Sequence, residues 1–171
     1  MSFKVYTNAL KHWTGKSRAT IIYDSTVDEF TYNGLFEKVK GKRNIALIGT
    51  TTEGDVFGGF YNLPVTKRWE EFYNPTIFAF SFESHGRCAT PQRFAVKERV
   101  SAKGYVRFYK NLSTAFVVFG LTGVGGFLLG NEQSDSSCNY MADCFEGLQN
   151  TTLTGSNRIH HCTRLVAVQL S

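Results

Sequence analysis

The sequence predicts a β-rich α+β fold in which short strands form a β sandwich. Apolar and aromatic runs recur at close spacing along the chain, and clusters rich in glycine, proline, asparagine and threonine separate them. A helical pattern with recognisable ends occurs in segment 31–41, so we expect helices to be few. The 171 residues are 42% hydrophobic and 15% aromatic, and no linker or repeat divides them. That composition provides enough apolar surface for a single core.

The first expected elements are a strand and a short helix. Apolar alternation in residues 19–23 predicts a half-buried strand. After a turn, Thr31 is suited to cap the N-terminus of a helix, and Gly41 is suited to end it in a left-handed conformation. The apolar residues at helical spacing between them are Leu35, Phe36 and Val39.

A hairpin is expected next, because the apolar runs 44–49 and 55–61 are separated by the polar segment 50–54. Gly58 and Gly59 interrupt the second run. Glycine inside a strand marks a β-bulge or a position where another backbone or ring comes close. The glycine pair therefore predicts one of these two features.

The hairpin leads into residues 62–75, which the sequence predicts to be a loop because prolines and asparagines occur at both ends. Lys67, Arg68 and Trp69 lie at its centre and are expected to be exposed. Their position makes them candidate residues for binding a partner.

The rest of the chain reads as a series of short strands. They are expected at residues 77–82, 94–97, 105–109 and 115–119, with a last strand at 164–170 that closes a sheet. This close spacing of strands is typical of a β sandwich.

One segment has to be tested as a membrane span, because residues 111–131 carry no charge and 126–130 matches a small-residue helix-packing motif. Its apolar part, 115–130, has four internal glycines. As a helix it would extend only about 24 Å, whereas the hydrocarbon core of a bilayer is about 30 Å thick. We therefore expect two buried strands joined by a glycine turn, and no transmembrane segment.

The charge balance is moderately basic, with 19 Lys and Arg against 14 Asp and Glu, a net charge of +5 and a pI near 9.1. The densest basic stretch is Lys38, Lys40, Lys42 and Arg43. A solvated helix end explains this stretch, because the helix dipole favours cations there. Binding of nucleic acid or anionic lipid through the basic excess is therefore an alternative function and not the expected one.

The cysteines predict free thiols. They are Cys88, Cys138, Cys144 and Cys162. No apolar run of signal-peptide length occurs near the N-terminus, so a cytoplasmic location is expected. The cysteines contain no Cys-x-x-Cys pair, and the adjacent His160 and His161 would point to opposite faces of a strand. We expect no metal site, and a structural role for these histidines.

Two segments resemble parts of nucleotide-binding loops without completing them. Residues 14–17 lack the upstream glycine of a P-loop, because Leu10 occupies its position. Residues 122–126 lack the third glycine and the βαβ context of a dinucleotide loop. No cofactor is therefore expected.

His85 and Cys88 are the closest approach to a catalytic pair, since an imidazole and a thiol could meet if the loop folded back. The sequence offers no third group to orient the imidazole. We therefore expect no enzyme, and the alternative is a thiol-dependent, peroxide-consuming enzyme centred on Cys88 with His85.

Several segments, taken in order, resemble the TLDc domain family. The matching segments are 17–23, 28–30, 35–36, 54–60, 78–82 and 118–131. The most specific is a glycine–aromatic signature made of Gly54, Phe57, Gly58, Gly59 and Phe60. The likeness extends over about residues 17–170. We therefore expect residues 17–171 to form a single TLDc-like domain and leave 1–16 as an N-terminal extension without assignment.

The resemblance implies a two-sheet antiparallel β sandwich flanked by a few short helices. It also implies a non-catalytic interaction domain, with links to oxidative-stress resistance and to binding of the vacuolar proton-pumping ATPase. The segment 168–171 departs from the family pattern, because Gln169 stands where an acid is usual and no tryptophan follows. A protein partner is expected, and the candidate contacts after the Phe-rich strand are His85 and Arg87.

Overall fold

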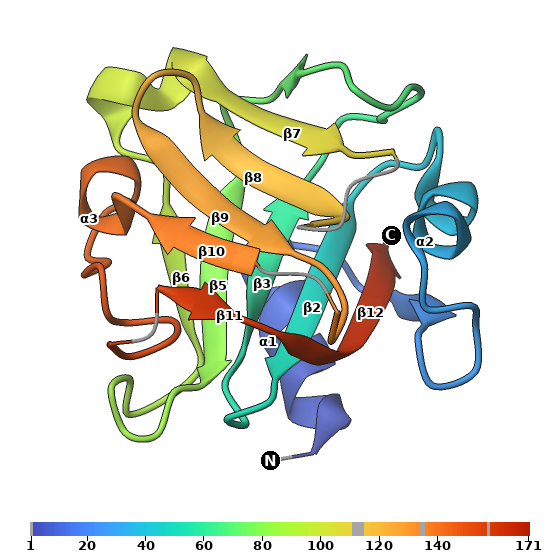
Figure 1. Ribbon diagram of the computed structural model, residues 1–171, viewed down its shortest axis with the longest axis horizontal. Helices are drawn as coiled ribbons and strands as arrows, with labels where there is room; N and C mark the ends of the chain where they lie inside the picture. The colour runs from blue at the N-terminus through green and yellow to red at the C-terminus, as the bar shows by residue number, and fades with distance from the viewer. Residues whose placement is uncertain (1, 111–114, 134–135, 157) are drawn as a thin grey trace.

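The chain folds into two antiparallel β-sheets that pack face to face, with short helices at their periphery (Figure 1). The computed structural model describes residues 2–110, 115–133, 136–156 and 158–171. Within these residues each sheet has six strands. The predicted two-sheet antiparallel sandwich flanked by a few short helices is therefore confirmed.

The first sheet has the strand order β1-β12-β2-β3-β5-β6. Its strands are β1 (Ala19–Asp24), β2 (Ile45–Thr51), β3 (Val56–Tyr61), β5 (Phe78–Glu83), β6 (Gln92–Ala95) and β12 (Cys162–Leu170). The predicted hairpin is β2–β3, and the predicted last strand is β12. Val168 of β12 pairs with Ile21 on one side and Ala46 on the other, so β12 lies inside the sheet and joins β1 to β2.

The second sheet has the strand order β11-β10-β9-β8-β7-β4. Its strands are β4 (Phe72–Tyr73), β7 (Gly104–Phe108), β8 (Val117–Leu121), β9 (Gly125–Leu129), β10 (Ser136–Asn139) and β11 (Ile159–His160). The β8–β9 hairpin confirms the two buried strands joined by a glycine turn. Residues 111–114 of the uncharged segment lie outside the described residues. No helix of the described chain is long and apolar enough to cross a membrane.

Strand β4 corrects the expectation that residues 62–75 form a loop throughout. Phe72 and Tyr73 pair with Val106 and Tyr105 of β7, and so extend the second sheet by a short edge strand. The sequence signal was hidden because a two-residue strand is too short to show alternation.

The helices of the described chain are α1 (Phe3–Thr14), α2 (Tyr32–Val39), α3 (Met141–Cys144) and the 3₁₀ helix η1 (Glu98–Lys103). The predicted N-cap of α2 is confirmed, because the Thr31 side chain accepts a hydrogen bond from the Gly34 amide at 3.0 Å. Gly41 follows the helix with a φ of 69°, the left-handed conformation predicted for it.

The glycine pair of β3 lets both layers of the core approach the strand closely. A Cβ on Gly59 would lie 2.7 Å from the Phe119 ring, and a Cβ on Gly58 would overlap the Leu47 carbonyl oxygen and lie 2.9 Å from the Phe80 ring. The predicted close approach is therefore confirmed at both glycines. The register of β3 against β5 also shifts, between Val56 and Phe57, so an irregularity accompanies the close approach.

Helix α1 covers the outer face of the first sheet, and lies behind that sheet in Figure 1. Tyr6 stacks on Phe82 at a centroid distance of 4.4 Å, and Trp13 stacks on the same ring at 5.8 Å. Leu10 is fully buried between them. Residues 3–14, which the sequence reasoning left unassigned, are thus packed against the sandwich. The described residues place no such helix over the outer face of the second sheet, which faces the viewer in Figure 1.

Candidate functional site

Polar residues from three separate segments meet at one end of the first sheet. Asp55 lies immediately before β3, and His85 and Arg87 lie in the turn after β5. The backbone of residues 152–153, from the connection after α3, completes the group. The antiparallel pairing of β3 with β5 brings the start of one strand beside the end of the other, which explains this meeting.

Asp55 is the buried centre of the group. Only 4% of its side chain is exposed. Its Oδ1 lies 2.6 Å from an Nη2 of Arg87 and 2.8 Å from Nδ1 of His85. A carboxylate removed from water needs such donors, because burial without them is costly. Since an ionised carboxylate only accepts, the geometry requires a proton on Nδ1 of His85.

Arg87 ties the group to the rest of the sandwich. Its Nε donates to the Thr152 carbonyl at 2.9 Å, and its Nη2 donates to the Leu153 carbonyl at 3.0 Å. About 26% of its side chain is exposed. The guanidinium therefore links the first sheet to the connection after α3, and most of its donors are already used within the protein.

His85 presents the accessible edge of the group. Its side chain is 55% exposed, and its backbone φ of 50° is unusual for a residue other than glycine. With Nδ1–H held by Asp55, Nε2 of the neutral ring can accept a hydrogen bond from a ligand. The structure therefore supplies the orienting group that the sequence reasoning did not find for His85.

The proposed pairing of His85 with Cys88 is not present among the hydrogen bonds of the described residues. The Cys88 amide is held by the Ser84 hydroxyl at 2.7 Å, and the Cys88 side chain is partly exposed. The thiol-based activity therefore stays a prediction, to be tested by chemistry.

The central loop residues make a second, separate group. Arg68 lies over the Phe36 ring at 4.8 Å and pairs with Glu37 at 3.5 Å. Only 19% of the Arg68 side chain is exposed, which corrects the expectation that this residue is exposed. Lys67 and Trp69 are exposed as expected, and the indole contacts the Tyr109 ring edge-on at 5.4 Å.

The two groups of predicted contact residues do not meet. Asp55 precedes the first residue of β3, whereas the segment carrying Lys67, Arg68 and Trp69 follows its last residue, Tyr61. They therefore lie at opposite ends of one strand, and a single small ligand would not reach both.

The glycine–aromatic signature has a structural position in this arrangement. Phe57 packs between the two sheets, whereas Phe60 belongs to the cluster beneath α1. Gly58 and Gly59 carry the close contacts described above, and Gly54 takes a φ of 90° in the turn before Asp55. The signature thus shapes the strand that presents Asp55.

The remaining cysteines and His160 lie in the core, whereas His161 is partly exposed. Burial raises the pKa of Cys138 to about 12 and that of Cys144 and Cys162 to about 11, so these thiols stay protonated at neutral pH. His160 is buried, with Nε2 3.0 Å from the Leu128 carbonyl oxygen, and burial lowers its pKa to about 4. Among the described residues no group of three or more His, Cys, Asp or Glu is placed to hold a metal ion.

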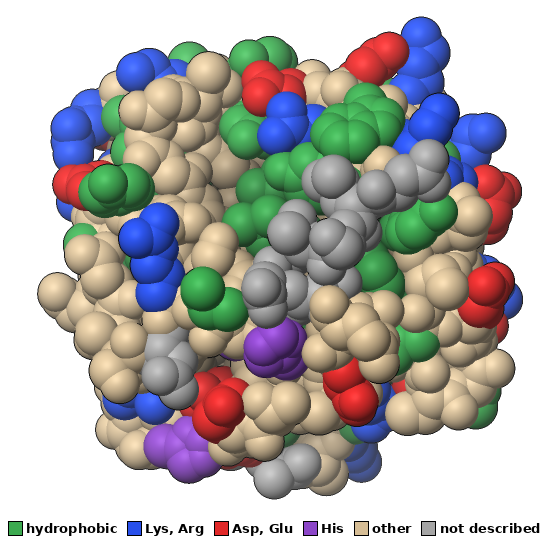
Figure 2. All heavy atoms as spheres, in the orientation of Figure 1, with side chains coloured by type: hydrophobic (Ala, Val, Ile, Leu, Met, Phe, Trp, Pro, Cys, Tyr) green, Lys and Arg blue, Asp and Glu red, His purple; other side chains and the backbone are tan. Residues whose placement is uncertain are grey.

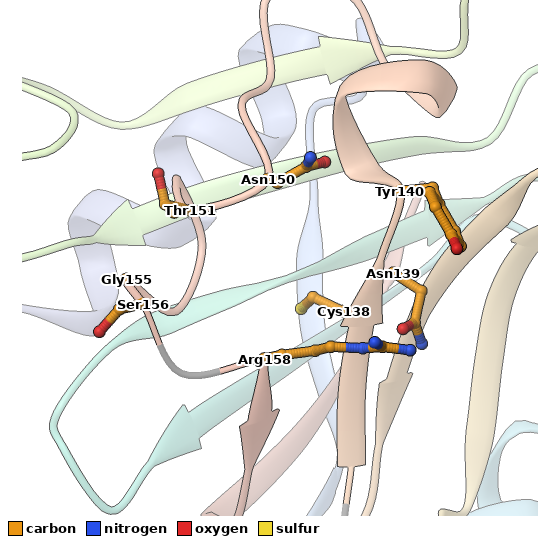
Figure 3. Close-up of a pocket in the computed structure, with 8 residues that line it drawn as sticks. All are labelled: Cys138, Asn139, Tyr140, Asn150, Thr151, Gly155, Ser156 and Arg158. Carbon is orange, nitrogen blue, oxygen red and sulfur yellow. The ribbon is translucent and has the colours of Figure 1, made fainter.

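Two neighbouring pockets open beside β9 and β10, and the sequence reasoning missed both. One, of about 260 Å³, lies between β10 and residues 150–156 and 158 (Figure 3). The other, of about 350 Å³, lies over the β8–β9 hairpin. Both are lined by Asn139 and Tyr140. Little in the sequence indicated these pockets, because the pattern of apolar residues in a strand does not show where the surface beside the strand is hollowed.

The chain was compared with known proteins. The family model described as the TLDc domain matches residues 2–162 of the 171. The match begins early enough to include α1, and it ends before the segment 168–171 in which the chain departs from the family pattern. Comparison with curated proteins gave no significant match. The match over most of the chain and the two-sheet sandwich together show that this chain belongs to the TLDc domain family.

Proposed function

We propose that this chain is a non-catalytic interaction domain that binds a protein partner. The observation that carries the proposal is a set of exposed aromatic side chains beside the outer face of the second sheet, over which the described residues place no helix, and where Figure 2 shows hydrophobic side chains gathered over β7 and β8. The exposed fractions are 48% for Trp69, 53% for Tyr73 and 62% for Tyr140. Exposed aromatic residues grouped on one face are typical of protein interfaces.

We further propose that the partner is the vacuolar proton-pumping ATPase and that the interaction serves the response to oxidative stress in the cytoplasm. Membership of the TLDc family supports this partner. The free thiols among the described residues suit a reducing compartment. The contacts we assign to the partner include Lys67, Trp69 and His85, which are exposed.

The test is affinity purification of the tagged chain from its own cells, with and without peroxide, followed by mass spectrometry. We expect proton-pump subunits to co-elute, and their amount to change with peroxide. Recovery of other proteins without pump subunits would reject the pump as partner. An empty eluate from both preparations would reject the interaction function itself.

A further inference from the structure

We propose that the two neighbouring pockets form one groove that binds a short segment of a partner protein, in which an apolar side chain stands next to an Asp or Glu. This inference rests on the proposed interaction function and names the surface and the chemistry of the partner. The groove is defined by the residues that line the two pockets, with Asn139 and Tyr140 common to both.

The apolar half of the groove lies on the outer face of the second sheet. Val118 pairs with Leu128, and Gly120 pairs with Gly126, across the β8–β9 hairpin. Gly126 lines the depression and has no side chain to fill it, whereas the Tyr105 ring packs over Gly120, 2.8 Å from where a Cβ would lie, and forms the border. The result is an apolar depression of about 350 Å³ whose lining residues carry no charge, which is suited to one apolar side chain.

The polar half of the groove contains a single cation without a partner. Arg158 is the one charged residue that lines this pocket, and its side chain extends across β10 towards Asn139 (Figure 3). Among the described residues, no hydrogen bond or ion pair involves its guanidinium group. Arginine binds a carboxylate through two parallel hydrogen bonds, so this half selects an acidic group.

Asn139 lines both halves of the groove, and its Nδ2 donates to the Ser137 hydroxyl at 2.9 Å. Its Oδ1 is shielded from solvent and so does not contact a ligand at the surface. The selection therefore comes from the two halves: an apolar side chain of the peptide fills the depression, while the adjacent acidic side chain accepts from Arg158.

Tyr140 stands between the two halves and is held in an unusual backbone conformation. Its φ is 52° and its ψ is 40°, and its carbonyl accepts the Asp143 amide at 3.0 Å in the first turn of α3. The ring is 62% exposed in spite of its size. A backbone outlier that presents an exposed aromatic ring marks a candidate contact, and tyrosine and arginine are the residue types that dominate binding energy at interfaces.

The charges favour a protein segment over nucleic acid or a membrane surface. Polyanions are bound by several cations that each contact a phosphate, whereas the two pockets together are lined by Arg158 as their one charged residue. One cation beside an apolar depression complements one anion beside an apolar side chain.

The direct test uses a phage-displayed library of random linear peptides, selected on the purified chain. We expect the enriched peptides to share an aromatic or aliphatic residue next to Asp or Glu. Arg158→Ala should weaken binding of a selected peptide about tenfold or more, as expected for a lost charge-assisted hydrogen bond. Tyr140→Asn, in which asparagine tolerates the left-handed conformation, should weaken it as well.

Arg43→Ala is the matched control, because it removes one arginine from an exposed position after α2 that lines neither pocket. It should leave peptide affinity unchanged. Enriched peptides without an acidic residue, or binding that Arg158→Ala leaves at the wild-type level, would overturn the proposal.

A second measurement separates this proposal from the proposed function. The tagged wild type, Arg158→Ala and Tyr140→Asn are each used to purify proton-pump subunits from the same lysate. Loss of the subunits with both variants but not with Arg43→Ala supports the groove as the binding surface. Equal recovery of pump subunits with the wild type and all variants refutes the groove as the binding surface but leaves the interaction function standing. If the wild type recovers no pump subunits, the pump is refuted as the partner. The groove is then tested by the peptide selection alone.

Discussion

Acidification should destabilise this protein through one buried side chain, His160. The residue is 2% exposed, and its Nε2 lies 3.0 Å from the Leu128 carbonyl oxygen. Its pKa is lowered from 6.5 to about 4, mainly by burial, and the nearby His161 acts in the same direction. Glu53 and Asp55 act in the opposite direction without cancelling the effect.

The size and sign of the effect follow from the two pKa values. The His160 side chain takes up its proton near pH 6.5 in the unfolded chain and only near pH 4 in the folded one. One pKa unit corresponds to about 1.4 kcal/mol, so this difference corresponds to about 3 kcal/mol. The folded-state pKa is the lower one, so the stabilisation is complete above the unfolded pKa and is lost as the pH falls towards the folded one.

The assay is urea denaturation followed by circular dichroism, at several values from about pH 7 to about pH 4. His160→Gln is the comparison, because glutamine can donate to the Leu128 carbonyl but does not titrate. Other ionisable groups are shared by both proteins and cancel in the difference. The wild type should lose about 3 kcal/mol more than the variant over this range. An equal loss in both proteins would refute the burial of a neutral imidazole as the cause.

Three further predictions concern packing, the polar group and thiol chemistry. Gly59→Ala should lower the free energy of unfolding by about 1–3 kcal/mol, because the new methyl group meets the Phe119 ring at 2.7 Å; an unchanged urea midpoint would contradict this. Arg87→Ala should lower it by about 2–3 kcal/mol, because the buried Asp55 carboxylate loses its 2.6 Å partner; a loss that Asp55→Asn does not relieve would point to the lost carbonyl contacts instead. Cys88→Ser should leave peroxide consumption at the background level of the wild type; a clear fall in rate would restore the thiol-enzyme hypothesis.

Local features of the fold were predictable because short-range physics decides them. The polar segment between two apolar runs identified the β2–β3 hairpin. Thr31 identified the start of α2, because its hydroxyl can cap the helix N-terminus. Helix α1 was missed although its signals were present: Tyr6, Leu10 and Trp13 recur at helical spacing, and Gly15 ends the helix in a left-handed conformation. A helix of this kind is stabilised by the sheet it covers, which the sequence does not display.

The candidate sites were less predictable because their parts come from distant segments. His85 and Arg87 were identified as candidates, but Asp55 precedes them by 30 and 32 positions, and the carbonyls that Arg87 binds follow it by 65 and 66 positions. Similarly, the uncharged segment around β8 predicted buried strands, but the sequence did not show that Tyr140 and Arg158, which come later in the chain, would line pockets beside them. Sequence patterns indicate which side chains are suited to burial, whereas the topology determines which surfaces are packed against another element of the fold.

The interior position of β12 has a consequence for how the protein is made. Strand β12 pairs with both β1 and β2, so β1 has no partner in the sheet until residues 162–170 have been synthesised. During translation the edges of β1 and β2 that later pair with β12 would therefore be unpaired. Unpaired strand edges can pair wrongly and lead to aggregation. Folding of the first sheet is expected to be a late, long-range event, and a truncation that removes only β12 would split that sheet in two.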